Sequence, residues 1–184
     1  DGEVLEAMAL HEALAREQET ALLNRLSATL VSVPSTPRMA DSLQREVLCI
    51  TGAAASQLFL PADAGSLTPA CPQEADAPPE RQRLAAWAFH QQKAIGLPHI
   101  TALTTLGIER WPASAAPRDL LPGTPGGDLY LPVQSTSGVE AVLYVGARRD
   151  GAPYSPHDAR LLVSIAHLVA GFLERQRFEM AAAR

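Results

Sequence analysis

The chain has 184 residues, of which 47% are hydrophobic, and this suits one domain with a sizeable core plus extra helix at the ends. Its formal net charge is −5 with no block of Lys or Arg, so nucleic acids and membrane surfaces are not expected partners. The apolar runs, such as Leu58–Leu60 and Val139–Val145, are too short for direct insertion into a membrane or for a signal peptide.

Two helices are predicted at the start of the chain. Residues 2–33 contain no Pro and no Gly after Gly2, and apolar residues recur at helical spacing. This stripe consists of Leu22, Leu26, Leu30 and Val33. Thr36 and Pro37 then predict the N-cap and first turn of a second helix that runs to about Gly52.

A β-hairpin and a covering helix follow. Residues 57–60 and 66–70 resemble two strands joined by a Gly-containing turn. After a Pro-rich stretch, residues 80–94 return to helical spacing. We expect this second region to be a helix that covers one face of the sheet, with Trp87 favoured as a core residue.

Residues 97–127 contain five prolines and predict a long loop, with room for a helical turn at 100–106. Residues 128–134 and 139–145 alternate apolar and polar side chains and predict a second hairpin. Because Pro132 cannot donate a backbone hydrogen bond, we expect it at a bulge or on an unpaired side of its strand.

The last helix has a clear start signal in Ser155, Pro156 and Asp158. Two adjacent apolar stripes follow, one for the sheet and one for another helix. They consist of Leu161, Ile165, Leu168 and Phe172, and of Leu162, Ala166, Val169 and Leu173. Together the elements predict an α+β fold, with an antiparallel sheet, helices on its faces and long N- and C-terminal helices.

No catalytic triad, metal site or cofactor is predicted. Ser155, His157 and Asp158 are too close along one helix to face one another, so helix capping is the better interpretation. The glycine-rich residues 123–127 lack the Gly-Lys-Ser/Thr of a phosphate-binding loop. Cys49 and Cys71 fit neither a disulfide framework nor a zinc site. No two histidines have the helical spacing of metal ligands among His11, His90, His99, His157 and His167.

The order of these elements resembles a GAF domain. Several segments are similar to the GAF domain of KdpD-type osmosensitive potassium-channel sensor histidine kinases. They are Leu84-Ala-Ala-Trp-Ala-Phe-His90, Ala94-Ile-Gly96, Leu121-Pro-Gly123 and Leu129-Tyr-Leu-Pro-Val133. The resemblance covers roughly residues 20–184, and residues 97–120 are an insertion relative to the family. The motifs of cyclic-nucleotide and bilin-binding relatives are missing from the sequence, so no ligand is carried over.

The resemblance implies a signalling helix at 1–34, a GAF-like sensory domain at 35–160 and a helix at 155–184 leading toward a kinase region. It implies a non-catalytic sensory and relay domain of a bacterial two-component sensor histidine kinase that responds to potassium or osmotic stress. We expect a cytoplasmic domain of an inner-membrane protein. The kinase motifs are missing from this sequence, so the kinase activity is expected elsewhere in the parent protein.

We expect a homodimer in which the terminal helices pair with their copies and relay the input. The expected contact residues are Leu22, Leu26, Leu30, Ile165, Leu168 and Phe172. The residues expected to line a small-molecule pocket are Trp87, Phe89, His90, His99 and Tyr130. Two alternatives stay open. One is a ligand-free structural spacer or dimerisation module whose pocket is filled by aromatic side chains. The other is a small-molecule enzyme with His90 or His99 as general base.

Overall fold

The computed structural model describes residues 2–33, 35–71, 77–92, 95–96, 128–152, 154 and 156–184. The helices are α1 (Gly2–Ser32), α2 (Thr36–Thr51), the short 3-10 turn η1 (Asp63–Gly65), α3 (Pro79–Gln91) and α4 (Pro156–Ala182). The strands are β1 (Ser56–Pro61), β2 (Leu67–Pro69), β3 (Ile95–Gly96), β4 (Leu129–Ser135) and β5 (Gly138–Val145). The predicted loop at 97–127, which includes the insertion at 97–120, lies outside the described residues.

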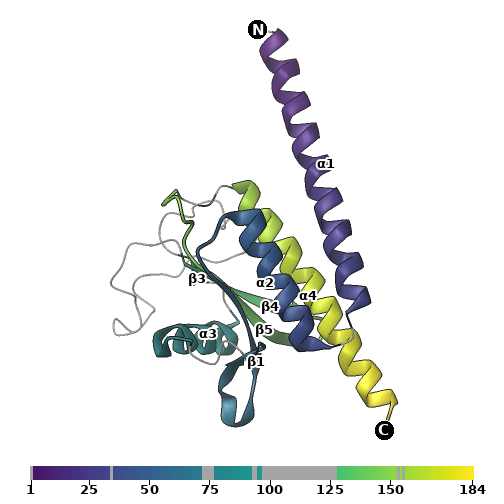
Figure 1. Ribbon diagram of the computed structural model, residues 1–184, viewed down its shortest axis with the longest axis vertical. Helices are drawn as coiled ribbons and strands as arrows, with labels where there is room; N and C mark the ends of the chain where they lie inside the picture. The colour runs from purple at the N-terminus through teal and green to yellow at the C-terminus, as the bar shows by residue number, and fades with distance from the viewer. Residues whose placement is uncertain are drawn as a thin grey trace.

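The five strands form one sheet in the order β2-β1-β5-β4-β3, and every neighbouring pair is antiparallel. Helices α2 and α4 cover one face of this sheet and α3 covers the other (Figure 1). Helix α1 packs along α4, and its N-terminal half extends beyond the rest of the described chain (Figure 1). The predicted α+β fold with long terminal helices is therefore confirmed.

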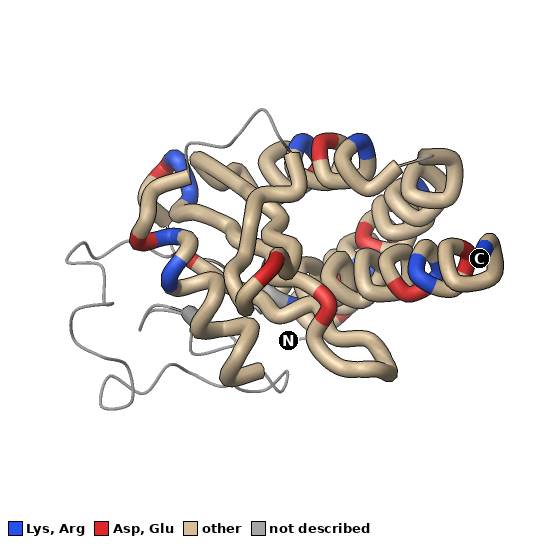
Figure 2. The backbone as a smooth tube through the Cα atoms, turned by 90° about the horizontal axis from the view of Figure 1, so that it is seen from below, with Lys and Arg blue, Asp and Glu red and all other residues tan. Residues whose placement is uncertain are grey.

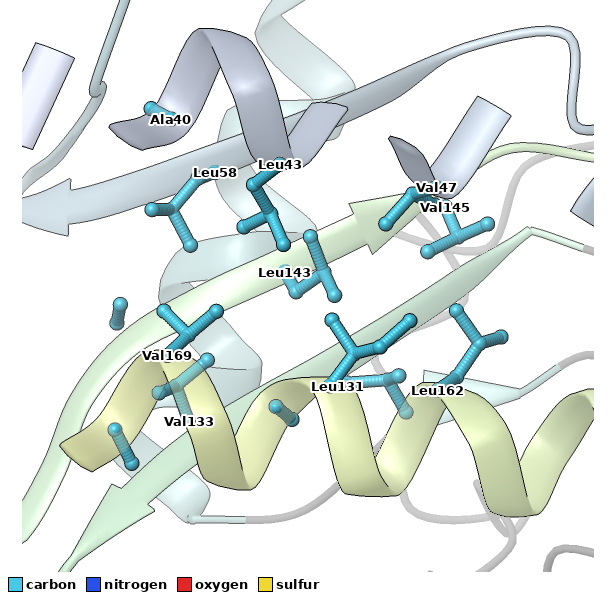
Figure 3. Packing of buried hydrophobic residues seen from close by; sticks show 14 of the residues in the cluster. Ala40, Leu43, Val47, Leu58, Leu131, Val133, Leu143, Val145, Leu162 and Val169 are labelled. Atoms are coloured by element: carbon cyan, nitrogen blue, oxygen red, sulfur yellow. The ribbon is translucent and has the colours of Figure 1, made fainter. Parts of the chain in front are cut away.

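Strand β5 supplies both layers of the core because alternate side chains of a strand point to opposite faces. Leu143 and Val145 face α2 and α4, whereas Val142 and Tyr144 face α3. The same alternation separates Leu58 from Phe59 in β1. Figure 3 shows the larger layer, in which side chains from three strands meet those of two helices. Its labelled residues are Ala40, Leu43, Val47, Leu58, Leu131, Val133, Leu143, Val145, Leu162 and Val169.

Local signals explain most of the element ends. Ser35, rather than the predicted Thr36, is the N-cap of α2, and Gly52 ends this helix in the left-handed conformation at φ 69°. The register of the β4–β5 pair shifts between Val133 and Gln134, one residue beyond Pro132, which itself lies opposite Val142. Helix α3 ends at Gln91, before the predicted end at residue 94.

The connection from β5 to α4 is fixed by polar contacts. The buried hydroxyl of Tyr154 donates to the carbonyl oxygen of Gly146, and burial raises its pKa to about 12, so it stays protonated at neutral pH. Arg148 contacts Asp150 at 3.0 Å and Asp158, in the first turn of α4, at 3.2 Å. Asp158 therefore ties α4 to the end of the sheet.

Charged residues of both signs are interspersed along the described helices instead of separating to opposite sides (Figure 2). Several pair with one another, as Arg25 with Glu46 and Arg177 with Glu140. No helix in the described part of the chain is long and apolar enough to cross a membrane.

The central position of β5 predicts a large effect for Leu143→Ala. Leu143 is fully buried, so the substitution removes apolar contacts and leaves a cavity, and we expect a loss of about 3 kcal/mol in the free energy of unfolding. Urea denaturation measures this change. Leu5→Ala is the matched control because Leu5 is 68% exposed, and we expect a change within about 0.5 kcal/mol. Equal effects of the two substitutions would contradict the assignment of β5 to the core.

Candidate functional site

A row of polar and aromatic side chains crosses the face of the sheet that α3 covers. Tyr144 of β5 lies directly opposite Gln57 of β1 on one side and Tyr130 of β4 on the other. Because directly opposite residues share a face, the three side chains stand next to one another. The ring centroids of Tyr130 and Tyr144 are 5.1 Å apart, and all three residues are buried.

Arg81 and Asp128 complete this site, which we call the α3-face cluster: Gln57, Arg81, Asp128, Tyr130 and Tyr144. Arg81 lies in the first turn of α3 and donates from Nη1 to Oε1 of Gln57 at 2.7 Å. Its guanidinium carbon lies 4.2 Å from the centroid of the Tyr144 ring, within range of a cation–π contact. Asp128 precedes β4 and accepts a hydrogen bond from the backbone N–H of Ala147 at 2.9 Å.

Burial sets the protonation of these groups. Loss of water raises the pKa of Asp128 above 3.8, although the Ala147 N–H, the charge of Arg81 and hydrogen bonding with Tyr144 oppose the shift. Burial also raises the pKa of Tyr130 and of Tyr144, and the charge of Asp128 adds to both shifts. Both phenols therefore stay neutral at physiological pH and can donate hydrogen bonds.

Apolar side chains surround the α3-face cluster. Phe59 and Val142 come from the sheet, and Leu84, Ala85 and Ala88 come from α3. The cluster thus brings together aromatic faces, one guanidinium, one carboxylate and phenolic donors, which are the groups that small-molecule sites use for stacking and hydrogen bonding.

Three of the five predicted pocket residues belong to this region. Tyr130 is buried in it, and Trp87 and Phe89 are partly buried and pack against the same apolar side chains. His90 is exposed instead, with Nε2 2.9 Å from the carbonyl oxygen of Gly65 and its ring edge-on to Phe89. His99 lies outside the described residues.

The sequence analysis did not identify Gln57, Arg81, Asp128 or Tyr144 as site residues. The signal that could have found two of them is strand alternation, which puts Gln57 and Tyr144 on the same face as the predicted Tyr130, opposite the larger core. The strand order that brings β1 next to β5 is a tertiary property, and the reach of Arg81 across to Gln57 depends on it.

The residues predicted for pairing between terminal helices pack within their own chain. Four are buried in the larger core, and Leu22 and Leu168 are partly buried against it. The four are Leu26, Leu30, Ile165 and Phe172. These four side chains are buried between elements of one chain, whereas Leu22 and Leu168 keep part of their surface exposed.

Both cysteines lie away from the α3-face cluster. Cys71 is buried in the larger core, where its Sγ lies 3.6 Å from the carbonyl oxygen of Pro37, and Cys49 is exposed on α2. Among the described residues, no group of three His, Cys, Asp or Glu side chains could hold a metal ion.

No protein-family model and no curated protein matches the sequence, but solved structures match the fold. The GAF domain of the potassium sensor histidine kinase KdpD from Escherichia coli is 24% identical, with a TM-score of 0.61 over 90% of this chain and 99% of that one. The chain has the GAF fold.

Two further solved structures are similar to this chain in fold. A methyl-accepting chemotaxis protein is 13% identical, with a TM-score of 0.58 over 82% of this chain and 95% of that one. Free methionine-R-sulfoxide reductase from Neisseria meningitidis, solved with its substrate, is 15% identical, with a TM-score of 0.62 over 91% and 92%. The GAF fold therefore serves in signalling proteins and also in an enzyme.

The raised pKa of Asp128 predicts a pH dependence of stability. Between 3.8 and the raised pKa the folded chain binds a proton more tightly than the unfolded chain, so the contribution of Asp128 to stability falls as pH rises through this window. Asp128→Asn removes this contribution and keeps an acceptor for Ala147. We therefore expect the free energy of unfolding of Asp128→Asn, relative to that of the unsubstituted chain, to increase from about pH 4 upward. Urea denaturation at a series of pH values measures it, and a difference that is constant with pH would contradict the assignment.

Proposed function

We propose that this chain is a non-catalytic sensory and relay domain of a bacterial two-component sensor histidine kinase. In this proposal a small molecule binds at the α3-face cluster, and its binding changes the position of the terminal helices. The observation that carries the proposal is the arrangement of β4 and β5, which bear the tyrosines of the cluster on one face and the side chains that contact α4 on the other.

The relay follows from alternation along these two strands. Tyr144 faces the cluster, and its neighbours Leu143 and Val145 support the helical layer. A shift of β5 that accommodates a ligand would therefore move the surface on which α4 rests. A coupling of about 1–3 kcal/mol between the two faces would change an output equilibrium by roughly 5- to 150-fold.

The non-catalytic part of the proposal is supported by the position of the thiols. Protein thiols are the side chains suited to sulfoxide reduction, and both cysteines of this chain lie apart from the α3-face cluster. His90, one of the two general-base candidates, contacts the backbone carbonyl of Gly65 and the ring of Phe89.

The stimulus and the setting are carried over from the relative with 24% identity. KdpD is a potassium sensor histidine kinase, and we propose a potassium or osmotic response for the longer protein to which this chain belongs. A homodimer and a cytoplasmic position in an inner-membrane protein belong to the same proposal.

A ligand-free structural spacer is the second candidate. It is favoured by the filling of the α3 face, where Phe59, Tyr130 and Tyr144 are buried and Arg81 covers one tyrosine ring. The two candidates differ in whether Arg81 can be drawn away from Tyr144 by a ligand.

Native mass spectrometry of the protein purified from cells distinguishes them. For a sensor we expect a small-molecule adduct on the unsubstituted chain. We expect the occupancy of this adduct to fall at least tenfold in Arg81→Ala, because the guanidinium is the cationic group of the site. Arg45→Ala is the matched control, since Arg45 is 78% exposed and pairs with Asp41 on α2.

An adduct that persists in Arg81→Ala would place the ligand elsewhere. A mass equal to that of the polypeptide alone, in all three proteins, would favour the spacer. The same spectrum reports the number of subunits.

A further inference from the structure

Helix α1 has one apolar face that is buried within the chain and an opposite, exposed face with large apolar residues at Leu10, Leu14 and Val31. Leu22, Leu26 and Leu30 pack against α2 and α4. A second set of residues recurs every three and four positions on the opposite side of the same helix. This outer seam consists of Ala7, Leu10, Leu14, Glu17, Ala21, Asn24, Ala28 and Val31.

The outer seam has the spacing of a coiled coil. With Ala7 at heptad position a, the a and d positions continue without interruption through four heptads to Val31. All eight residues are exposed, and the three large apolar ones are Leu10 at 63%, Leu14 at 49% and Val31 at 63%. The buried residues of α1 occupy positions c and f, so the two faces do not compete.

The N-terminal half of α1 needs a contact that its own chain does not supply in the described structure. Residues 2–14 are all exposed, and the N-terminal half of α1 projects from the rest of the described chain (Figure 1). Its neighbours there are His157 and Arg160 at the start of α4, which line a hollow together with Val4, Met8 and other residues of this half. A short helical segment without tertiary contacts is marginal in water. A second copy of the same helix would cover the seam and support this half.

The residues that flank the outer seam suit a parallel pair of identical helices. In a parallel pair, position g of one helix meets position e of the next heptad on its partner. These positions bring Glu6 to His11 of the other copy, and no pair of like charges arises at the later e and g positions of α1. Asn24 at a d position adds a polar layer that in-register pairing places opposite Asn24 of the other copy, where the two amides can hydrogen-bond to each other.

We propose that the outer seam of α1 is the contact through which two copies of this chain form a parallel, in-register dimer. The proposal deepens the relay function above and rests on it for its biological role. It replaces the predicted contact residues, which are occupied within each chain, by residues on the opposite side of α1. Glu17 faces Glu17 of the other copy in this arrangement. The repulsion between the two carboxylates limits the affinity, so small changes can shift the equilibrium between monomer and dimer.

Analytical ultracentrifugation of the full chain tests which face pairs. We expect Leu14→Glu to raise the dimer dissociation constant at least tenfold, because it introduces a charge into an apolar layer. We expect Glu17→Leu to lower the constant at least tenfold, because it removes the repulsion between two carboxylates. Leu5→Glu is the matched control, since Leu5 is 68% exposed and lies at position f, opposite the outer seam.

Cysteine cross-linking in a Cys49→Ser background tests the direction of the helices. In a parallel, in-register pair, Ala7→Cys and Ala28→Cys each meet their own copy and form disulfide-linked dimers on mild oxidation. Ala9→Cys, an exposed alanine away from the outer seam, should stay unlinked. An antiparallel pair can link at only one of the two seam positions and would overturn the proposal.

Three other results would also overturn it: a monomer at high concentration, a dimer insensitive to Leu14→Glu, and equal cross-linking at Ala9. Circular dichroism of each variant checks that α1 remains helical. The ligand adduct lost in Arg81→Ala is measured independently, so failure of the seam and failure of the sensory function give different results.

Discussion

The fold depends on the burial of β5 on both of its faces. Antiparallel sheets often leave one face in water, but here α2 and α4 cover one side and α3 covers the other. Each residue of β5 is therefore committed to one of two cores, and a shift of register by one position would exchange Leu143 with Tyr144. The pairing of β5 with β1 and β4 is consequently fixed by packing on both sides.

The two cores have different chemistry. The side covered by α2 and α4 is built mainly from aliphatic side chains, with Phe172 and Tyr154 as aromatic members. The α3 side carries Tyr130, Tyr144, Arg81 and Asp128 beside its apolar residues. A partly buried carboxyl and guanidinium are costly to desolvate, and each is compensated by a specific contact, the Ala147 N–H for Asp128 and Gln57 for Arg81. Polarity on this face is thus confined to groups that have defined partners.

Helical periodicity and strand alternation predicted the long helices and both hairpins, because these signals are local. The strand β3 could not be predicted, since its two residues are held by pairing with Tyr130 and Leu129 of a distant strand. The direction of His90 toward Gly65 depends on the placement of the first hairpin, which the sequence does not specify. The leucine stripe of α1 was visible as a pattern, but a pattern alone does not distinguish a contact within the chain from one between chains.

The inward face of α1 also bears on where the folding unit begins. Leu26 and Leu30 are 1% and 3% exposed, so the second half of α1 closes the helical layer. A boundary at residue 34 divides the chain by role, but a fragment that starts there would leave apolar surface on α2 and α4 open to water. The second half of α1 is therefore part of the unit that folds. Any motion of α1 along α4 has to break packing contacts of the larger core.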